Sequence, residues 1–347
     1  MAQATDLDRD QFYATLRQLN LPPLWERLHQ LLPKQPTVKS RPFAVTYETI
    51  RPLLLEAARL VPEHEAERRV LILENPHLPN SSAATETLYA GLQIIMPGEI
   101  ARAHKHTPAA LRFIIEGSGA YTSVNGEKAF MEAGDLILTP SMTWHDHGHL
   151  GQGPTVWLDV LDIPIVRNIG PAYAIPYASE TFPECAPPGD SNYRFGAGMI
   201  PLGWRPETRS SPIFHFPYKQ TRLALEKLRQ TSPTDPCHGL KMEYVNPTTG
   251  GATMPTISIF LQLLTAGFKG AAYRTTEGSI YCIREGRARV FIGEHDEIQI
   301  DAKTNDVFVI PCWHPHRFEA DNDAVIFSAS DKVIQQALGF WQEQRPT

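Results

Sequence analysis

The sequence predicts an all-β protein built from two copies of one barrel, with a helical extension before them and a helix after them. Three observations support this prediction. Short apolar strands separated by turn residues fill two regions of the chain, and the 30 prolines and 23 glycines favour turns and extended segments over helical bundles. The two regions also resemble one another, and a repeated antiparallel sandwich is typical of a pair of jelly-roll barrels.

The composition narrows the class of protein. A chain of 347 residues is long enough for two domains, and a hydrophobic fraction of 42% suits a folded core. The net charge of -6, with both signs mixed along the chain, argues against nucleic acid or a membrane surface as a partner. No apolar stretch is long enough to span a bilayer, and the first residues lack a secretory signal. Four widely spaced cysteines without a CxxC pair indicate reduced thiols in a cytoplasmic protein.

The order of helical and strand patterns divides the chain into five parts. Apolar spacing in "QFYATLRQLNLPPLWERLHQLL" and "YETIRPLLLEAARLV" predicts helices near the N-terminus, and the turn residues Asn125-Gly126 predict a hairpin further on. "TRLALEKLRQT" predicts a helix in the middle of the chain, and "SDKVIQQALGFWQEQ" predicts one at its end. We therefore expect a helical extension at 1–80, a first barrel at 81–165, a connecting segment at 166–255, a second barrel at 256–330 and a C-terminal helix at 331–347.

The two strand-rich regions share the spacing of their key residues. His104 lies thirteen positions before Gly117 in the first region, and Tyr273 lies thirteen positions before Gly286 in the second. Each region then carries a proline followed by Trp and His, in "TPSMTWHDH" and "IPCWHPHRF". This agreement indicates an internal duplication.

The pair "HKH" in the first copy is the main chemical signal. Alternate residues of a strand point to the same face, so His104 and His106 project together. Such a pair alone is more often structural, but His145 supplies a third imidazole at the matching place of "TPSMTWHDH". In the second copy Tyr273 stands where His104 does, and only His316 remains. We therefore expect one metal per chain, held in the first barrel by His104, His106 and His145.

These residues follow the cupin pattern. Gly98 precedes the histidine pair by the interval found in cupins, and Gly134, Pro140 and His145 reproduce the second half of the pattern. The glutamate that commonly completes the cupin ligand set would fall at Ala110, which cannot bind a metal. Three neutral imidazoles suit Fe, Zn, Cu or Ni, so the ligands alone do not select the metal. Three ligands on one face leave room for a chelating substrate and O2.

Longer stretches resemble the gentisate 1,2-dioxygenase family. They include "AHKHTPAALRFIIEGSGAYTSVNGEK", "GDLILTPSMTWHDHGH" and "YVNPTTGGATMPTISIFLQLL", so the resemblance covers most of the chain. It implies a bicupin that binds Fe(II), one ion per chain in the first cupin, with a degenerate second cupin. It also implies that O2 cleaves the ring of gentisate between the carboxyl-bearing and hydroxyl-bearing carbons and gives maleylpyruvate.

Arginine and glutamine side chains are the candidates for substrate binding. Arg112 lies at even spacing from both histidines, which places its fork on the metal face and suits it to a carboxylate; the alternative is an exposed strand charge. Arg68 or its neighbour Arg69 could supply a second clamp, with one of the two facing solvent. Gln93 is a polar residue in an apolar strand, which favours a pocket lining over an edge position.

Two further residues are candidates for catalysis. His147 lies two positions after His145 and could relay a proton near neutral pH. Asp159, in "TVWLDVLD", could orient His147 or a metal-binding histidine through a ring N–H. Asp162 competes for that role but fits the end of a strand.

Other functions stay open at this point. Salicylate or 1-hydroxy-2-naphthoate 1,2-dioxygenase would share the ligands and differ only in the pocket. A cupin isomerase or decarboxylase is disfavoured by Ala110, and a non-catalytic binding cupin by the intact first site. The family resemblance also implies a homo-oligomer, commonly a tetramer, acting on a small aromatic hydroxy acid and O2.

Overall fold

The computed structural model describes residues 6–346, and its contacts divide the chain into two units, 1–37 and 38–347. The first unit contains the helices α1 (Asp6–Gln18) and α2 (Leu24–Leu31), which confirms the helical pattern of the N-terminus. Prolines at 22 and 23 separate the two helices, because proline cannot donate the backbone hydrogen bond that a helix interior requires. Trp25 Nε1 donates to Tyr13 Oη at 3.0 Å and ties the helices together.

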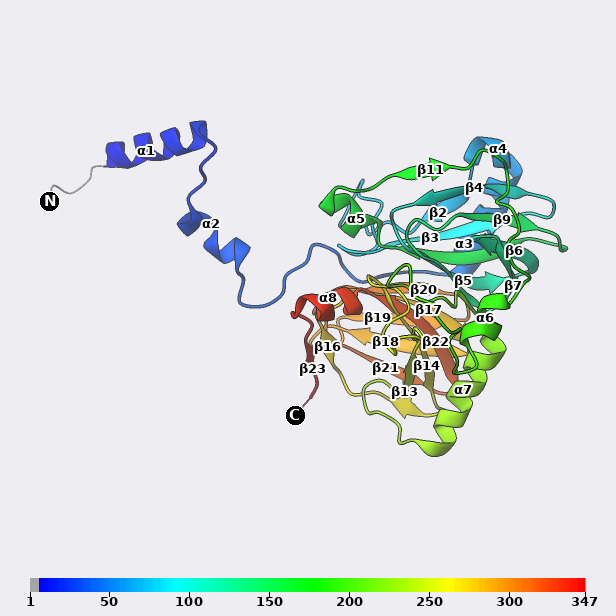
Figure 1. Cartoon of the computed structure of the whole chain (residues 1–347). Coiled ribbons are helices and arrows are strands. Elements are labelled where there is room, and N and C mark those ends of the chain that lie inside the picture. Colours follow the sequence, from blue (N-terminus) through cyan, green and yellow to red (C-terminus); the bar gives the residue numbers. More distant parts are fainter. Residues whose placement is uncertain (1–5, 347) are drawn as a thin grey trace. The chain divides into compact units, whose positions relative to one another are not determined.

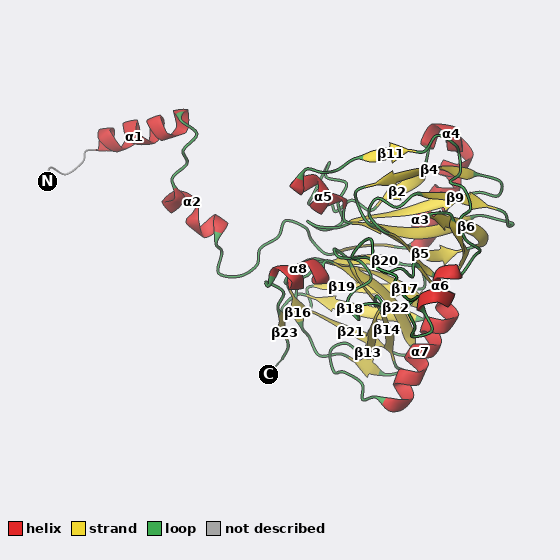
Figure 2. Cartoon of the chain, in the orientation of Figure 1, coloured by secondary structure: helices red, strands yellow, loops and turns green. Residues whose placement is uncertain are grey.

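The second unit contains two barrels, as the duplication predicts (Figures 1 and 2). One sheet of the first barrel has the strand order β12 (His215–Phe216), β8 (Leu136–Thr139), β5 (Ala110–Glu116), β10 (Thr155–Leu161), β3 (Tyr89–Ile95) and β2 (Arg69–Ile72). The facing sheet has the order β11 (Ala174–Pro176), β4 (Ile100–His106), β9 (His145–His149), β6 (Ser118–Val124) and β7 (Glu127–Glu132). Helix α3 (Tyr47–Leu60) packs on β2 and β3.

The second barrel repeats this arrangement. Its larger sheet has the order β1 (Phe43–Val45), β20 (Val307–Ile310), β17 (Ser279–Glu285), β22 (Ala324–Ser330), β14 (Ser258–Leu264) and β13 (Leu240–Glu243). The smaller sheets are β15 (Phe268–Lys269), β21 (His316–Ala320), β18 (Arg287–Ile292) and β19 (Ile298–Lys303), and the pair β16 (Arg274–Thr275) and β23 (Glu343–Gln344). The remaining helices are α4 (Glu63–Ala66), α5 (Ile163–Ile169), α6 (Asp190–Phe195), α7 (Tyr218–Thr231) and α8 (Lys332–Leu338).

The sheets extend beyond the limits expected from the sequence. Strands β1 and β2 lie within the part predicted as a helical extension, yet β1 pairs with β20 and β2 with β3. The C-terminal helix is shorter than predicted, because Gly339 takes a φ of 80° at the end of α8. The following residues form β23, which pairs with β16.

Hydrogen bonds at equivalent places confirm the duplication. The backbone N–H of Thr107 donates to Tyr173 O, and that of Thr276 donates to Gln342 O, both at 3.0 Å. At the start of α5, Asp162 accepts from the N–H of Ala109, and at the start of α8 Asp331 accepts from that of Gly278. The repeated unit therefore includes a helix and an edge strand after each barrel.

The two barrels pack against each other through their larger sheets, and their interiors differ. Phe113 of β5 stacks on Phe327 of β22 with ring centroids 4.0 Å apart, in an apolar core that draws on both sheets. The interior of the second barrel is a separate apolar cluster that includes Tyr281, Phe308 and Phe318. Aromatic rings fill the interior of the second barrel, which is therefore a packed core. The interior of the first barrel contains the polar groups described below.

Two expectations from the sequence concern membrane-spanning helices and the state of the cysteines. Among residues 6–346, no helix combines the length and the apolar character needed to cross a bilayer. All four cysteines are free thiols.

Candidate metal centre

The three predicted histidines meet in the first barrel. His104 and His106 lie on β4, and His104 is paired with His145 on the neighbouring strand β9. Their candidate ligand atoms all lie within 4.8 Å of one another, and the ring centroids of His104 and His145 are 4.2 Å apart. Within the part of the chain that the structure describes, this is the one group of three metal-binding side chains.

Backbone carbonyls orient two of these imidazoles for metal binding. Nδ1 of His106 lies 2.7 Å from Pro108 O, and Nδ1 of His145 lies 3.0 Å from Thr143 O. Because a carbonyl only accepts, Nδ1 carries the proton and the Nε2 lone pair remains free. Nε2 of His145 is buried without any hydrogen-bond partner, which is the state of an atom that awaits a ligand.

The electrostatics keep the imidazoles neutral. Burial lowers the pKa of His104 to about 2, and the nearby Arg68 adds to the effect. Burial also lowers the pKa of His106 to about 4 and that of His145 well below its usual range. Neutral imidazole is the form that binds a metal, so the site is ready for a cation at neutral pH.

Arg112 and Asp159 form a buried pair beside this centre. They lie opposite each other on β5 and β10, so both side chains point to the same face of the sheet. Arg112 Nε lies 3.5 Å from Asp159 Oδ1, and another guanidinium nitrogen donates to Thr139 Oγ1. Burial raises the pKa of Asp159 to about 6, although the charge of Arg112 acts in the opposite direction. Arg112 is therefore a buried cation inside the barrel, fixed in position by Asp159 and Thr139, and not an exposed strand charge.

Arg68 and Arg69 have different roles. Arg68 Nη2 lies 2.6 Å from Nδ1 of His104 and 2.9 Å from Arg102 O, so Arg68 reaches the metal centre. Arg69 is buried and pairs with Glu99 at the edge of the barrel. The expectation that one of the two faces solvent is wrong, because Arg69 is buried and Arg68 is half-buried.

His147 lies deep in the same interior. It is fully buried on β9, with its ring centroid 5.9 Å from that of His145 and 5.4 Å from that of Trp157. Its Nδ1 is 2.9 Å from Thr122 Oγ1, while its Nε2 has no partner. Burial, then the charge of Arg112, lowers its pKa well below the usual range. His147 is therefore a neutral imidazole with an unpaired nitrogen inside the barrel.

The expectation that Asp159 orients an imidazole is wrong. The hydroxyl of Thr122 holds His147, and Asp159 faces Arg112 instead. The pairing register of β10 with β5 is the reason, since it sets Asp159 opposite Arg112. Asp162 is a residue at the end of β10, as expected, and accepts from Ala109 N–H and Thr256 Oγ1.

Gln93 lies on the inner side of β3. It is buried, and its partner across the strands is Trp157. Because Gly91 is opposite Asp159 on the same strand pair, Gln93 shares the face of the Arg112–Asp159 pair. This position is consistent with a pocket lining.

Sequence reasoning missed three residues of this interior. Thr122 and Thr139 hold His147 and Arg112, and the ring of Trp157 lies beside His147. Threonines in strands carry no distinctive signal, so only the cross-strand register identifies them.

The second barrel lacks this centre. His316 is paired with Tyr273 as His145 is with His104, and its Nδ1 lies 2.9 Å from His314 O. The Tyr273 ring takes the place of an imidazole and lies 4.3 Å from His316, centroid to centroid. Phe318, two residues after His316, fills the place that His147 occupies in the first copy.

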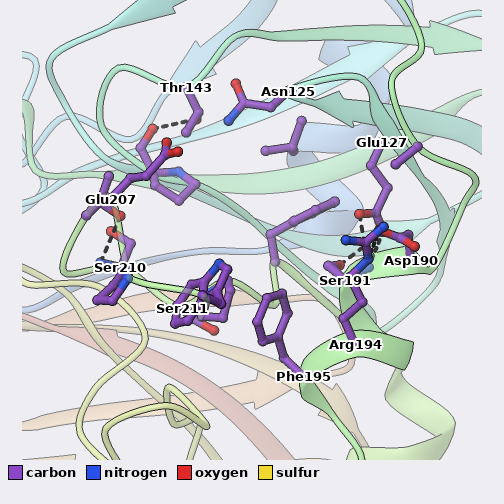
Figure 3. Close-up of a pocket in the computed structure, with 18 of the residues that line it drawn as sticks. Asn125, Glu127, Thr143, Asp190, Ser191, Arg194, Phe195, Glu207, Ser210 and Ser211 are labelled. Carbon is purple, nitrogen blue, oxygen red and sulfur yellow. Dashed lines mark hydrogen bonds and ion pairs between the residues drawn. The ribbon is translucent and has the colours of Figure 1, made fainter. Parts of the chain in front are cut away.

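A cavity of about 370 Å³ lies outside the loop that leads to His145 (Figure 3). Thr143 and Asn125 line it from the barrel, while Phe195, Glu207 and Ser211 line it from the connecting segment. The Thr143 carbonyl accepts from the ring of His145, so the connecting segment packs against the loop that holds a metal ligand.

Fold and site together define a class of protein. Two jelly-roll barrels, one with three convergent neutral imidazoles and one degenerate, make the chain a bicupin with a candidate metal centre in its first barrel. The donor set fits a metal, because three nitrogens converge and the one on His145 is buried and unpaired.

Comparisons with known proteins identify the family. The cupin domain model matches residues 91–161. The chain is 44% identical to gentisate 1,2 dioxygenase 1 of Aquipseudomonas alcaligenes, over 99% of this chain and 98% of that protein, and 36% identical to a gentisate 1,2-dioxygenase of Ralstonia sp, over 99% and 96%. The crystal structure of salicylate 1,2-dioxygenase from Pseudoaminobacter salicylatoxidans, with gentisate adducts, superposes with a TM-score of 0.91 at 31% identity, over 99% of this chain and 95% of that chain. The chain belongs to the gentisate 1,2-dioxygenase family of ring-cleaving bicupin dioxygenases.

Proposed function

We propose that this protein is a gentisate 1,2-dioxygenase that uses one Fe(II) ion held by His104, His106 and His145. With O2 it would open the ring of 2,5-dihydroxybenzoate between the carboxyl-bearing carbon and the adjacent hydroxyl-bearing carbon. Both oxygen atoms enter the product, maleylpyruvate. The observation that carries the proposal is the three-histidine centre in a chain that is 44% identical to a gentisate dioxygenase over its whole length. When bound, Fe(II) supplies the redox chemistry that a protein side chain cannot supply.

Arg112 and Arg68 provide the positive charge that an aromatic carboxylate requires. Arg112 is buried and pre-oriented by Thr139 and Asp159, so little side-chain freedom is lost when it binds an anion. Arg68 lies against Nδ1 of His104. A guanidinium only donates, so it cannot share Nδ1 of His104 with a ring proton. If His104 held the metal through Nε2 with its proton on Nδ1, Arg68 would be free to bind the carboxylate of the substrate.

His147 is the candidate proton acceptor. Its position supports this role, because Thr122 lies at Nδ1 and Nε2 is unpaired. Burial lowers its pKa well below the usual range, so His147 is a weak base and the expectation that it titrates near neutral pH is wrong. Asp159 acts as a positioning residue for Arg112. Gln93, buried on the same face of the sheet as Asp159, is the candidate lining for the aromatic ring.

A second candidate is salicylate 1,2-dioxygenase activity. The observation that favours it is the TM-score of 0.91 with a salicylate dioxygenase, whose structure contains gentisate adducts. A ring with one hydroxyl is poorer in electrons than one with two, so gentisate is the easier substrate for the same centre. The homotetramer and the cytoplasmic location expected from the sequence stay predictions.

Oxygen uptake tests the proposal. The protein is loaded with Fe(II) without air and then given gentisate, salicylate or 1-hydroxy-2-naphthoate in separate reactions. We expect fastest uptake with gentisate and one O2 consumed per ring opened. Faster uptake with salicylate would support the second candidate, and no uptake with any of the three would reject a dioxygenase.

Two matched variants test the assignment of the metal centre. His145→Ala removes a ligand, and iron affinity should fall by more than the ~10–100-fold typical of supporting residues. His316→Ala removes the equivalent imidazole of the second barrel and should leave the iron content unchanged. Equal iron loss in both variants would show that the wrong barrel was assigned.

A further inference from the structure

The backbone carbonyls that orient His106 and His145 are themselves held in place. Pro108 O, which lies against Nδ1 of His106, belongs to the same peptide group as the N–H of Ala109. That N–H donates to Asp162 Oδ1 at 2.8 Å. A peptide group is planar and here trans, so its C=O and N–H point in opposite directions and the two hydrogen bonds fix its plane. Asp162 therefore holds the carbonyl that orients the imidazole of His106.

His145 is held in the same way. Its Nδ1 lies 3.0 Å from Thr143 O, and the N–H of the same peptide group, on Trp144, donates to Asn125 Oδ1 at 2.9 Å. The N–H of Asn125 donates in turn to Trp144 O at 2.8 Å, which joins the turn after β6 to the loop before β9. Asn125 has a φ of 47°, a conformation that asparagine adopts more readily than most residues. An asparagine here thus combines the backbone conformation of the turn with a side-chain acceptor.

At His316, the equivalent of His145 in the second barrel, this support is missing. Nδ1 of His316 lies 2.9 Å from His314 O, so the carbonyl is present. The next residue is Pro315, which takes the place of Trp144 and whose nitrogen carries no hydrogen. No side chain can therefore hold this peptide group from its other side. The full arrangement accompanies the histidines of the metal centre and is not repeated at the imidazole of the degenerate barrel.

Asp162 and its equivalent Asp331 distinguish a structural role from a positioning role. Each precedes a helix, α5 or α8, yet its side chain forms no capping hydrogen bond. Asp331 accepts from the N–H of Gly278, as Asp162 does from the matching loop of the first barrel. Thr275, however, stands where His106 does in the first copy, so Asp331 supports no imidazole. The two aspartates therefore form a matched pair in which only one acts on a metal ligand.

We propose that Asn125 and Asp162 are positioning residues of the metal centre, which act on His145 and His106 through one peptide group each. The torsion that turns an imidazole ring has a broad energy well, so the hydrogen bond at Nδ1 sets the direction of the Nε2 lone pair. The carboxylate of Asp162 also polarises its peptide group toward the ring, because hydrogen bonds in a chain strengthen one another. Thr256, in the segment that leads into β14 of the second barrel, donates to Asp162 Oδ2 at 2.6 Å and fixes this carboxylate. Both roles rest on the metal centre of the proposed function.

Binding of Co(II) to the full-length protein, measured by competition with a chelator and by absorption of the bound metal, tests the role of Asn125. Asn125→Gly removes the acceptor and keeps a residue that adopts positive φ. Its affinity for Co(II) should fall ~10-fold, the lower end of the range for residues that support a ligand, and the absorption spectrum should change. Asn125→Asp keeps the side-chain oxygen and should restore both. The matched control is Asn80→Gly, at another exposed asparagine with a φ of 61°, which should leave both unchanged.

Variants in both barrels test the role of Asp162. Asp162→Ala should lower the affinity for Co(II) ~10-fold, whereas Asp331→Ala, the same change in the second barrel, should leave it unchanged. Thr256→Val removes the hydroxyl that fixes Asp162 but keeps the carboxylate, so it should lower the affinity by less. It is also the variant to measure if Asp162→Ala does not fold. Thr256→Ser keeps the hydroxyl and should match the wild type.

Several outcomes would overturn the proposal. They are unchanged affinity in Asn125→Gly, equal losses in Asp162→Ala and Asp331→Ala, and a wild-type protein that binds no Co(II). A lower affinity with an unaltered spectrum at saturating Co(II) would overturn it too, because it would indicate a general loss of stability and not a change in ring orientation. Oxygen uptake does not enter these measurements, so a failure of the proposed dioxygenase activity is detected separately.

Discussion

At the scale of single residues, burial decides the chemistry of the centre. The three histidines and His147 share one interior, and desolvation is the first cause of the lowered pKa of each. A charged imidazole would be costly there, so the site selects the neutral form that binds metal ions. The two guanidiniums beside them add positive potential, which favours an anionic substrate once the metal is in place.

The pH dependence of activity should report on Asp159. Its pKa is raised to about 6, so the carboxylate that positions Arg112 is lost as the pH falls through 6. We expect kcat/KM for gentisate to fall on the acid side of that value, and Asp159→Asn to remove this dependence while lowering the rate at all pH values. Oxygen uptake from below to above pH 6 measures both. An unchanged acid limb in the variant would contradict the assignment.

Stability should respond to the same group in the opposite sense. The folded state binds the proton of Asp159 more tightly than the unfolded state, whose value is near 3.8. The contribution of this group to the free energy of unfolding therefore falls as the pH rises from about 4 to about 6. Denaturant unfolding at several pH values measures how the free energy of unfolding changes with pH. The Asp159→Asn variant is the control, because it lacks this titrating group.

At the scale of elements, turns with positive φ join the strands that carry the site. Asn125 and Gly126 form the hairpin between β6 and β7 with φ values of 47° and 84°, as the dipeptide predicts. Gly117, at the junction of β5 and β6, has a φ of 94° and no room for a side chain. The same place in the second barrel is Gly286, with a φ of 77°.

Two glycine substitutions distinguish two contributions to the loss of stability. One is the strain of a positive φ, and the other is the steric contact of a new Cβ with its neighbours. In Gly117→Ala the new Cβ would meet Pro154 O and lie 2.7 Å from Thr155 Cα. Gly98 also has a positive φ, 85°, but a Cβ there meets nothing within 4 Å. We expect Gly98→Ala to cost ~1–2 kcal/mol and Gly117→Ala an additional ~1–3 kcal/mol. Urea unfolding measures both, and equal losses would contradict the crowding argument.

At the scale of the whole molecule, the degenerate barrel supports the active one. Strand β1 precedes the first barrel in the chain but joins the large sheet of the second, and Phe113 stacks on Phe327 between the barrels. The interior of the second barrel contains an apolar cluster where the first barrel has the three histidines. The second barrel covers the outer face of the sheet that carries Arg112 and Asp159.

Removal of a ring between the barrels should therefore destabilise both together. Phe327→Ala should cost ~3–5 kcal/mol and keep a single unfolding transition, because the two barrels share one core. Phe340→Ala, at a position 52% exposed, is the control and should change stability by less than ~0.5 kcal/mol. Chemical denaturation followed by fluorescence measures both. Two separate transitions in the Phe327 variant would show that the barrels fold independently.

The sequence by itself determined the features that depend on local spacing. Alternation along a strand places His104 and His106 together, and the repeated "TPSMTWHDH" pattern supplies His145, because strand period and turn chemistry are properties of neighbouring residues. Tertiary structure decided what depends on register. It set Asp159 against Arg112 and Thr122 against His147, since contacts between strands follow from pairings that no single strand encodes.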